Sequence, residues 1–340
     1  AVCAVIVLLT AGIGWQYSRQ TAAEAEPAEP EFIRWVDFEA SYEALEAALE
    51  LDIASQETDT PVSWIDLIAL AAAKNGNNFS GFKRRELEGY VQQLQEGKSL
   101  EALTENLRYF PYYQEAYGAA LGGLVGHFEI EVDDETAPGG KRFAPQYGLK
   151  AFLPIAKGYP YSDFDDFGVS RTYGFTRRHL GHDFMGATGT PIIAVEGGVV
   201  EALGWNQYGG WRIGIRSLDG RRYYYYAHLR QNFPFNKSLE EGSIVQPGDV
   251  IGYMGHTGYS TKENVNNIDT VHLHFGLQLI FDESQKEGNN EIWVDCYNLT
   301  RFLYKNRSAV QKVGESREWK RTLQMTDPAV VKYQKTVKKQ

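Results

Sequence analysis

Cysteine is nearly absent from this chain of 340 residues, which contains only Cys3 and Cys296. Cys3 lies in an apolar N-terminal run and Cys296 lies far along the chain, so we expect no disulfide between them. The fold is expected not to rely on disulfides. Neither cysteine has a partner at the C-x-x-C spacing of thiolate metal sites. Any metal in this protein is therefore expected to bind nitrogen and oxygen ligands.

An excess of positive charge is also missing. The 34 Lys and Arg residues are outnumbered by 44 Asp and Glu residues, which gives a formal net charge of -10 at pH 7. Proteins that bind nucleic acid usually present basic surfaces, so we exclude nucleic acid as the main partner. The length is sufficient for two domains and a sizeable core.

Charge is absent altogether from residues 1–18, an apolar run that Arg19 ends. The chain starts without Met, so we expect further residues upstream, and about 20 apolar residues are enough to cross a bilayer. Trp15 and Tyr17 suit a membrane interface. We therefore predict a single-pass transmembrane anchor; the alternative is a signal peptide that is cleaved near residues 23–25. In either case the rest of the chain is predicted to be exported, and it would be secreted if the run is cleaved.

Residues 19–31 are rich in Ala, Glu and Pro and have no large apolar side chain, so they are predicted to form an extended linker. Apolar residues then recur at helical spacing through residues 32–130, in segments bounded by Ser and Gly. Ser63 and Asp66 predict a capping box at one helix start, and Gly76 predicts the end of that helix. We expect four or five short helices in a small helical domain.

The pattern changes after this helical domain. Residues 131–145 contain Gly and Pro among polar residues and are predicted to form a linker or a long hairpin. Residues 146–308 contain short β-rich runs separated by Gly turns, which predicts an antiparallel β domain, either a sheet or barrel-like. Residues 309–340 are a polar tail, expected to be exposed or partly disordered. The fold class predicted for the whole chain is α+β.

The β domain contains a set of residues suited to metal chemistry. His179 and Asp183 form an H-x-x-x-D motif, His228 follows a run of tyrosines, and His272 and His274 form an H-x-H motif. Residues at i and i+2 of a strand point to the same face, so one histidine of the H-x-H pair can bind a metal while the other handles protons. Zinc accepts nitrogen and oxygen ligands, and a catalytic zinc keeps one position open for water. The set as a whole predicts a single-zinc hydrolytic site.

Each of these motifs alone is weak evidence, because an H-x-x-x-D or H-x-H motif is common by chance and a lone histidine is usually structural. Their order inside one β domain favours the hydrolytic interpretation. The segments around them also resemble the lysostaphin-like, LytM-type zinc endopeptidases, the twenty-third metallopeptidase family. The resemblance covers residues 146–308, about half of the chain. The segments that carry it are HLGHDFMGATGTPIIA, YYYYAHL, GSIVQPGDVIGYMGHTG and VHLHFG.

This resemblance implies a role for each of the five residues. His179, Asp183 and His274 would bind one Zn²⁺ ion per chain. His272 would be the general base that acts on the attacking water, and His228 would orient that water or stabilise the tetrahedral transition state. Members of the family cleave peptides of bacterial peptidoglycan. The resemblance therefore implies this substrate class. The predicted anchor would place the catalytic domain outside the bacterial cell membrane. The helical domain carries no such resemblance and could be a spacer, a regulator or a module that binds cell-wall proteins.

Two departures from the family pattern affect this interpretation. His182 stands beside Asp183 where the family usually has an apolar residue. We expect its side chain to point away from the metal; the alternatives are a supporting group or a substitute ligand. The segment 259–271, before the H-x-H motif, is longer than the usual short turn, and it either lines one side of a substrate groove or is a solvated loop. His256 and His127 are expected to be structural.

Three functional interpretations follow. The first is an exported zinc-dependent endopeptidase that hydrolyses peptide cross-links of bacterial peptidoglycan. The second is a catalytically latent scaffold or activator in a cell-wall or sporulation complex, and the presence of all five residues favours catalysis over it. The third is a carrier domain, because GSIVQPGDVIG resembles a turn of biotinyl- and lipoyl-type domains. That segment contains no lysine that could be modified.

Overall fold

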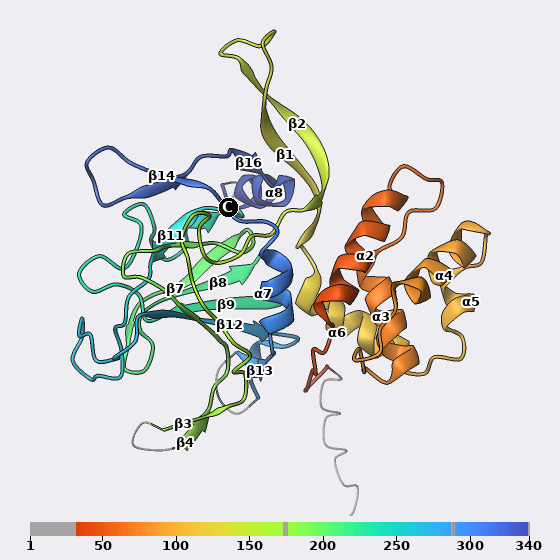
Figure 1. Cartoon of the computed structure of the whole chain (residues 1–340), viewed down its shortest axis with the longest axis horizontal. Coiled ribbons are helices and arrows are strands. Elements are labelled where there is room, and N and C mark those ends of the chain that lie inside the picture. Colours follow the sequence, from red (N-terminus) through yellow and green to blue (C-terminus); the bar gives the residue numbers. More distant parts are fainter. Residues whose placement is uncertain (1–31, 173–175, 287, 289, 339–340) are drawn as a thin grey trace, which may run out of the picture. The chain divides into compact units, whose positions relative to one another are not determined.

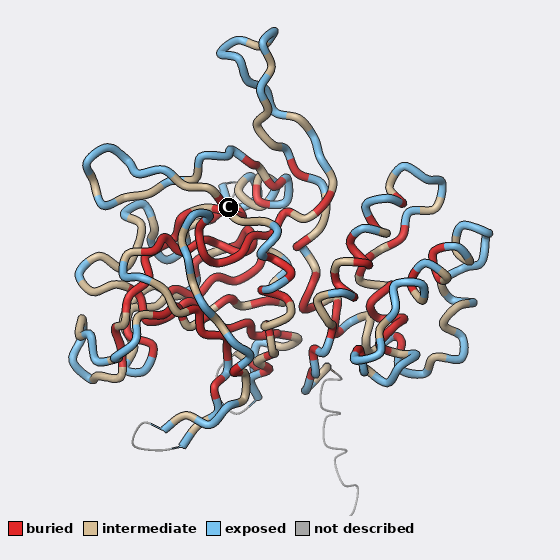
Figure 2. The backbone as a smooth tube through the Cα atoms, viewed as in Figure 1, coloured by how far each residue is buried: buried red, intermediate tan, exposed pale blue. Residues whose placement is uncertain are grey.

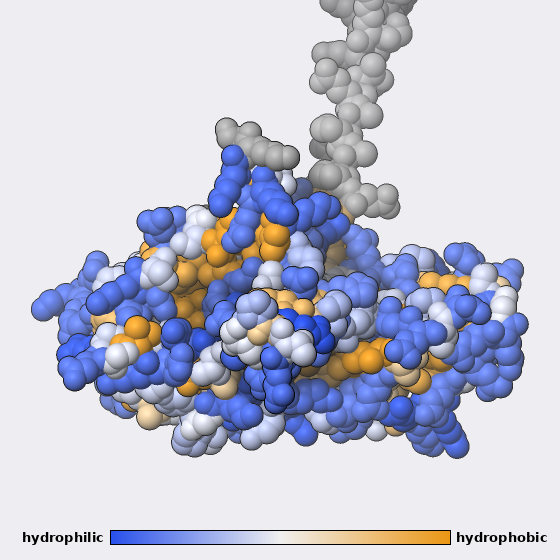
Figure 3. Space-filling view, turned by 90° about the horizontal axis from the view of Figure 1, so that it is seen from above, coloured by the Kyte–Doolittle hydropathy of each residue, from blue (hydrophilic) through white to orange (hydrophobic). Residues whose placement is uncertain are grey.

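The computed structural model describes residues 32–172, 176–286, 288 and 290–338. The predicted anchor at 1–18 and the predicted linker at 19–31 lie outside the described residues. Residues 34–340 form one compact unit. Within the described part of the chain, no helix is both long enough and apolar enough to cross a membrane. The face shown in Figure 3 is mainly hydrophilic, with smaller hydrophobic patches between the polar side chains.

Residues 42–121 form a group of five helices (Figure 1). Gly76 ends α3 in the left-handed conformation, with φ of 61°, as predicted. The predicted capping box at the start of α3 is wrong: Ser63 makes no side-chain capping bond, and Asp66 instead accepts a hydrogen bond of 2.7 Å from Gln114 of α6. Tertiary contact with the neighbouring helix therefore replaces the local cap. The helices are α2 (Tyr42–Ser55), α3 (Trp64–Asn75), α4 (Arg84–Gln95), α5 (Leu100–Thr104) and α6 (Phe110–Leu121).

A long antiparallel hairpin follows these helices. Its strands are β1 (Val125–Asp133) and β2 (Lys141–Leu149), paired from Val125 opposite Leu149 to Asp133 opposite Lys141. Residues 131–145 therefore form the outer part of a hairpin, which was the second of the two interpretations of this segment. The other interpretation, a linker, is wrong, because paired strands continue on both sides of the turn.

The main sheet has seven strands and is antiparallel. Its order is β10-β7-β8-β9-β12-β13, and β5 also pairs with β12. The barrel-like alternative is wrong, because the sheet is open: the terminal strands β10 and β13 contain two residues each and pair with one neighbour. These strands are β5 (His182–Met185), β7 (Gly198–Asn206), β8 (Gly210–Ser217), β9 (Arg222–Ala227), β10 (Ile244–Val245), β12 (His272–Leu279) and β13 (Ile292–Trp293).

Buried residues are concentrated on the central strands of the main sheet and on the segments next to them (Figure 2). Fully or almost fully buried side chains on β8, β9 and β12 include Ile213, Ile215, Tyr224, Leu273 and Phe275. Short paired strands and two small helices surround the sheet. They are β3 (Ser170–Thr172) with β4 (Thr176–Arg178), β6 (Pro191–Ile193) with β11 (Val250–Tyr253), η1 (Glu283–Gln285) and α7 (Tyr297–Leu303).

Most residues of the C-terminal segment are exposed, as expected, but the segment forms regular structure, which corrects the alternative of partial disorder. It forms β14 (Val310–Lys312), β15 (Trp319–Arg321), β16 (Met325–Thr326) and α8 (Pro328–Val337). Strand β16 pairs with β1, and Met325 packs with Phe128 and Phe152 in a buried cluster. Val330 of α8 is fully buried. A few anchoring residues in a polar segment therefore hold it against the hairpin.

The helices α2 and α3 are in direct contact with the hairpin and with α7. Trp64 of α3 stacks on Phe302 of α7 with ring centroids 5.9 Å apart, and Asp52 of α2 accepts a hydrogen bond of 2.7 Å from Tyr147 of β2. The predicted division of the chain at residues 130 and 145 therefore does not coincide with a boundary between compact units.

Candidate metal centre

Strand β12 positions two of the candidate residues, and its neighbours position two more. His272 and His274 are two residues apart, and His274 lies opposite Asp183 of β5 and opposite Ala227 of β9. Because β5 and β9 flank β12 on its two edges, Asp183 is brought directly beside His274. His228 follows the last residue of β9, and its ring lies 4.7 Å from that of His272.

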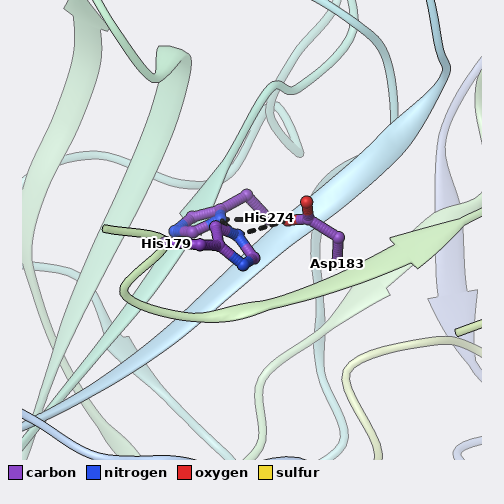
Figure 4. A group of neighbouring side chains, drawn as sticks. All are labelled: His179, Asp183 and His274. Carbon is purple, nitrogen blue, oxygen red and sulfur yellow. Dashed lines mark hydrogen bonds and ion pairs between the residues drawn. The ribbon is translucent and has the colours of Figure 1, made fainter. Parts of the chain in front are cut away.

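His179 lies in the turn between β4 and β5 and completes a cluster of three. Its Nε2 lies 3.0 Å from Oδ1 of Asp183 and 2.9 Å from Nδ1 of His274. The same Nδ1 of His274 lies 3.0 Å from Oδ1 of Asp183. Figure 4 shows the three side chains converging on one point. Their donor atoms all lie within 4.8 Å of one another, which makes them a candidate metal site.

This cluster fits a zinc ion. A tetrahedral zinc with ligand distances of about 2.0–2.2 Å holds neighbouring ligands roughly 3.4 Å apart, so the three donors need to separate by only a few tenths of an ångström. Gly181 makes room for one ligand, because a Cβ there would lie 2.6 Å from Cε1 of His274. Two imidazoles and one carboxylate are also a ligand set that zinc accepts in catalytic sites.

The far side of His179 is held by Asp166. Nδ1 of His179 lies 3.0 Å from the carbonyl oxygen of Asp166 and 3.1 Å from its carboxylate Oδ2. Nδ1–H of His179 donates to these oxygen atoms of Asp166. Because this contact fixes the ring, Nε2 is directed toward Asp183 and His274. Asp166 is itself buried and pairs with Arg171 at 2.7 Å. Sequence reasoning missed Asp166, because nothing in SDFDDFG distinguishes it from the two aspartates beside it.

The acid–base state of the metal-free cluster follows from these contacts. Burial opposes the charged form of His179, but hydrogen bonds to Asp166 and Asp183 outweigh it and raise the pKa of His179 to about 9. Burial likewise opposes ionisation of Asp183, yet hydrogen bonds from His179 and His274 hold its pKa well below the usual range. Burial lowers the pKa of His274. A metal that binds at neutral pH must therefore displace a proton from His179.

The two remaining histidines are oriented by backbone carbonyl groups. Nδ1–H of His228 donates to the carbonyl oxygen of Thr257, and Nδ1–H of His272 donates to that of Thr270, each over 2.9 Å. Each imidazole thus keeps Nε2 for another partner, and Nε2 of His272 lies 3.9 Å from Oδ1 of Asp183. Burial and the neighbouring imidazoles hold the pKa of His228 well below its usual value, so its ring is neutral at pH 7. His228 also has φ of 61°, an uncommon conformation for histidine.

All five residues line one pocket of about 250 Å³. Sequence reasoning missed the residues that form its remaining walls, since tyrosine and arginine carry no motif that marks them as site residues. Tyr259, the first residue of the segment 259–271, lines the pocket beside His228, with ring centroids 5.8 Å apart. One end of this segment therefore reaches the site. The other missed residues are Arg171, Arg177, Tyr208 and Tyr225.

Two other histidines near this site lie outside the cluster. His182 points to the opposite face of β5 from Asp183, where its Nε2 lies 3.0 Å from Asp163. This confirms the expectation that it points away from the metal. His256 places Nδ1 2.6 Å from the carbonyl oxygen of Ile268, in keeping with a structural role.

Residues 177–290 match the model of Peptidase family M23. This match spans β5 to β12 and includes all five candidate residues. Residues 177–290 form a domain of this family, which is homologous to the LytM- and lysostaphin-type endopeptidases. This confirms the resemblance inferred from the motifs.

Two curated relatives and one solved structure are similar to parts of this chain. The L-Ala–D-Glu endopeptidase of Bacillus subtilis (strain 168) is 41% identical over 131 residues, which are 38% of this chain and 38% of that protein. Lysostaphin of Staphylococcus simulans is 34% identical over 120 residues, 35% of this chain and 20% of lysostaphin. The chain thus spans less than two fifths of either relative. A crystal structure from Ruminococcus gnavus ATCC 29149, provisionally designated glycyl-glycine endopeptidase lytM, covers 85% of this chain and 94% of its own, with 25% identity and a TM-score of 0.49.

Proposed function

We propose that this chain is an exported, zinc-dependent endopeptidase that hydrolyses peptide cross-links of bacterial peptidoglycan. The observation that carries the proposal is the convergence of His179, Asp183 and His274 on one point, beside two further imidazoles in the same pocket. The relatives named above as endopeptidases support it. A scaffold or activator would have no need for the two imidazoles that do not belong to the three-donor cluster.

Each residue then has a distinct task. His179, Asp183 and His274 would hold the ion, and zinc when bound polarises a scissile carbonyl group and acidifies a water molecule. His272 would accept the proton of that water on Nε2, because its Nδ1–H is occupied by Thr270.

His228 has two possible tasks, and its hydrogen bonding favours one of them. A neutral ring whose Nδ1–H donates to Thr257 offers only an acceptor at Nε2. This supports orientation of the attacking water rather than hydrogen-bond donation to the transition state.

The test combines zinc content with digestion of purified peptidoglycan by residues 32–340. We expect one zinc per chain, and loss of both zinc and peptide release in His274→Ala. In His272→Ala, zinc should remain while peptide release falls by about 10²–10⁴-fold, the usual contribution of a general base. His127→Ala, which removes an imidazole that packs on Tyr147 outside the pocket, serves as the control. A wild-type chain without zinc would disprove the site, and zinc without peptide release would favour the latent scaffold.

A further inference from the structure

A second groove of about 720 Å³ opens beside the metal centre. We call it the side groove. Its lining comes from β4, β7, β8, β9, β12 and β13, so it runs across the strands of the main sheet. It shares Arg177, Tyr208, Tyr225 and His274 with the pocket of the metal centre. A peptide held at the metal can therefore continue into the side groove.

The floor of the side groove is aromatic. Tyr225 lies next to the metal cluster, with its ring centroid 6.0 Å from that of His274 and 6.1 Å from that of Trp293. Glycines lie beneath the aromatic rings, and a Cβ at any of them would overlap the ring above it. The pairs are Gly209 with Tyr225, Gly214 with Tyr223 and Gly276 with Trp293. The missing Cβ atoms of these glycines therefore allow the three aromatic side chains to pack closely against the backbone of the sheet.

Two half-buried arginines of this groove have no acidic partner. Arg177 comes from β4 and Arg212 from β8, and neither forms an ion pair with any carboxylate of the described residues. Nε of Arg177 and Nη1 of Arg212 are enclosed without a hydrogen-bond partner in that part of the chain. A guanidinium that is partly removed from water normally has an acceptor, because an unsatisfied charged donor costs free energy.

The acids of the same groove are already engaged. Glu201 binds Lys286 at 2.6 Å, Glu291 accepts a hydrogen bond of 2.7 Å from Nε1 of Trp293, and Glu241 accepts one of 3.0 Å from the backbone N–H of Leu203. Burial raises the pKa of the Tyr225 hydroxyl, and the positive charges of Arg212 and Arg177 partly oppose this rise. Both arginines line the side groove together with Tyr225, and the guanidinium of Arg177 also lies over the ring of Tyr259, 5.1 Å from its centroid.

We propose that the side groove binds a carboxylate of the peptide substrate between Arg177 and Arg212, and so selects peptides that carry an acidic group near the scissile bond. This inference rests on the proposed function, because it assigns the groove to the same substrate. A carboxylate would supply the acceptors that the two guanidinium groups lack, in the charge-assisted geometry that arginine favours. The carboxylate could belong to an acidic residue within the peptide or to its C-terminus.

The experiment uses four peptidoglycan stem peptides. The α-carboxylate of the D-glutamate is free or amidated, and the C-terminal carboxylate is free or amidated, in all combinations. Values of kcat/KM are measured for zinc-loaded wild type, Arg177→Gln, Arg212→Gln and Arg317→Gln. Arg317 is exposed, and its substitution removes the same charge far from the groove lining. Affinities for uncleavable analogues of the four peptides are measured beside them.

We expect wild type and Arg317→Gln to prefer the acidic form by about tenfold or more, as charged hydrogen bonds allow. In Arg177→Gln and Arg212→Gln, with zinc retained, that ratio should fall toward one. The peptide position at which amidation matters identifies the carboxylate. Arg177 is two residues from His179, so Arg177→Gln could lose zinc. In that case the peptide preference of Arg212→Gln alone tests the proposal.

Equal rates for all four peptides in wild type would overturn the proposal. So would variants that slow every peptide by the same factor. If wild type cleaves no peptide, the proposed function fails, but the affinity ratio for acidic and amidated analogues still tests the carboxylate site. An unchanged ratio in the arginine variants would then reject it.

Discussion

At the scale of single residues, three of the four imidazoles of the pocket are held by oxygen atoms on the side that faces away from it. His228 and His272 use backbone carbonyl groups, whereas His179 also uses the carboxylate of Asp166. A carboxylate behind a ligating imidazole raises its basicity and fixes its orientation. Asp166 is therefore the group outside the three-donor cluster that we expect to affect zinc affinity most.

Asp166→Asn tests this expectation. The backbone carbonyl oxygen of Asp166 still accepts from His179, but the negative charge is lost, so zinc affinity should fall by about 10–100-fold. Competition with a chromogenic chelator measures it. Asp163→Asn is the matched control, since Asp163 pairs with His182 on the other face of β5. An equal loss of affinity in both variants would mean that the general charge, and not the contact with His179, is responsible.

Residue type, spacing and the family resemblance together singled out the five candidate residues, which line one pocket in the structure. An H-x-H in a strand places two imidazoles on one face, whatever the rest of the fold does. Asp166 and Arg177 were not predictable, since their importance depends on contacts between segments that only the folded chain brings together.

At the scale of elements, periodic apolar residues predicted the helices and the β-rich region, but not the C-terminal segment. Residues 309–340 are mostly polar, and their order depends on a few anchors. Asp327 is one of them: it caps α8 through Ala329 and forms a buried ion pair of 2.6 Å with Lys150. Such a pair joins residues 177 positions apart, so no local pattern reveals it.

Asp327→Ala should destabilise the folded chain by about 3–5 kcal/mol, because it leaves Lys150 buried without its partner. Urea unfolding measures the change. Glu131→Ala is the control, since Glu131 pairs with Lys141 at a comparable 2.9 Å on the exposed part of the hairpin, and should cost at most about 1 kcal/mol. Similar losses in the two variants would show that α8 is not anchored by this pair. Zinc content should be the same in both.

At the scale of the whole molecule, one buried arginine joins the helices to the sheet. Arg222 of β9 donates to the carbonyl oxygen of Ala119 at the end of α6 over 2.7 Å, and it binds both carboxylate oxygens of Glu196 at 2.8 and 3.1 Å. Gly123 leaves space for this pair, since a Cβ there would overlap Oε1 of Glu196. The helices α2–α6 are thus tied to a strand that also leads to His228.

This connection predicts that the helices and the sheet unfold together. Arg222→Met leaves the buried Glu196 with the Tyr224 hydroxyl but without its cation and should lower the free energy of unfolding by about 3–5 kcal/mol, whereas adding Glu196→Gln, which removes the charge and keeps an acceptor for Tyr224, should restore part of it. Hydrogen exchange followed by mass spectrometry reports on residues 42–121 and 198–279 separately. In Arg222→Met, both segments should lose the same amount of protection. Faster exchange of the helices alone would show that they open independently, and Arg222 would then be a local support of α6 rather than a link between the two parts.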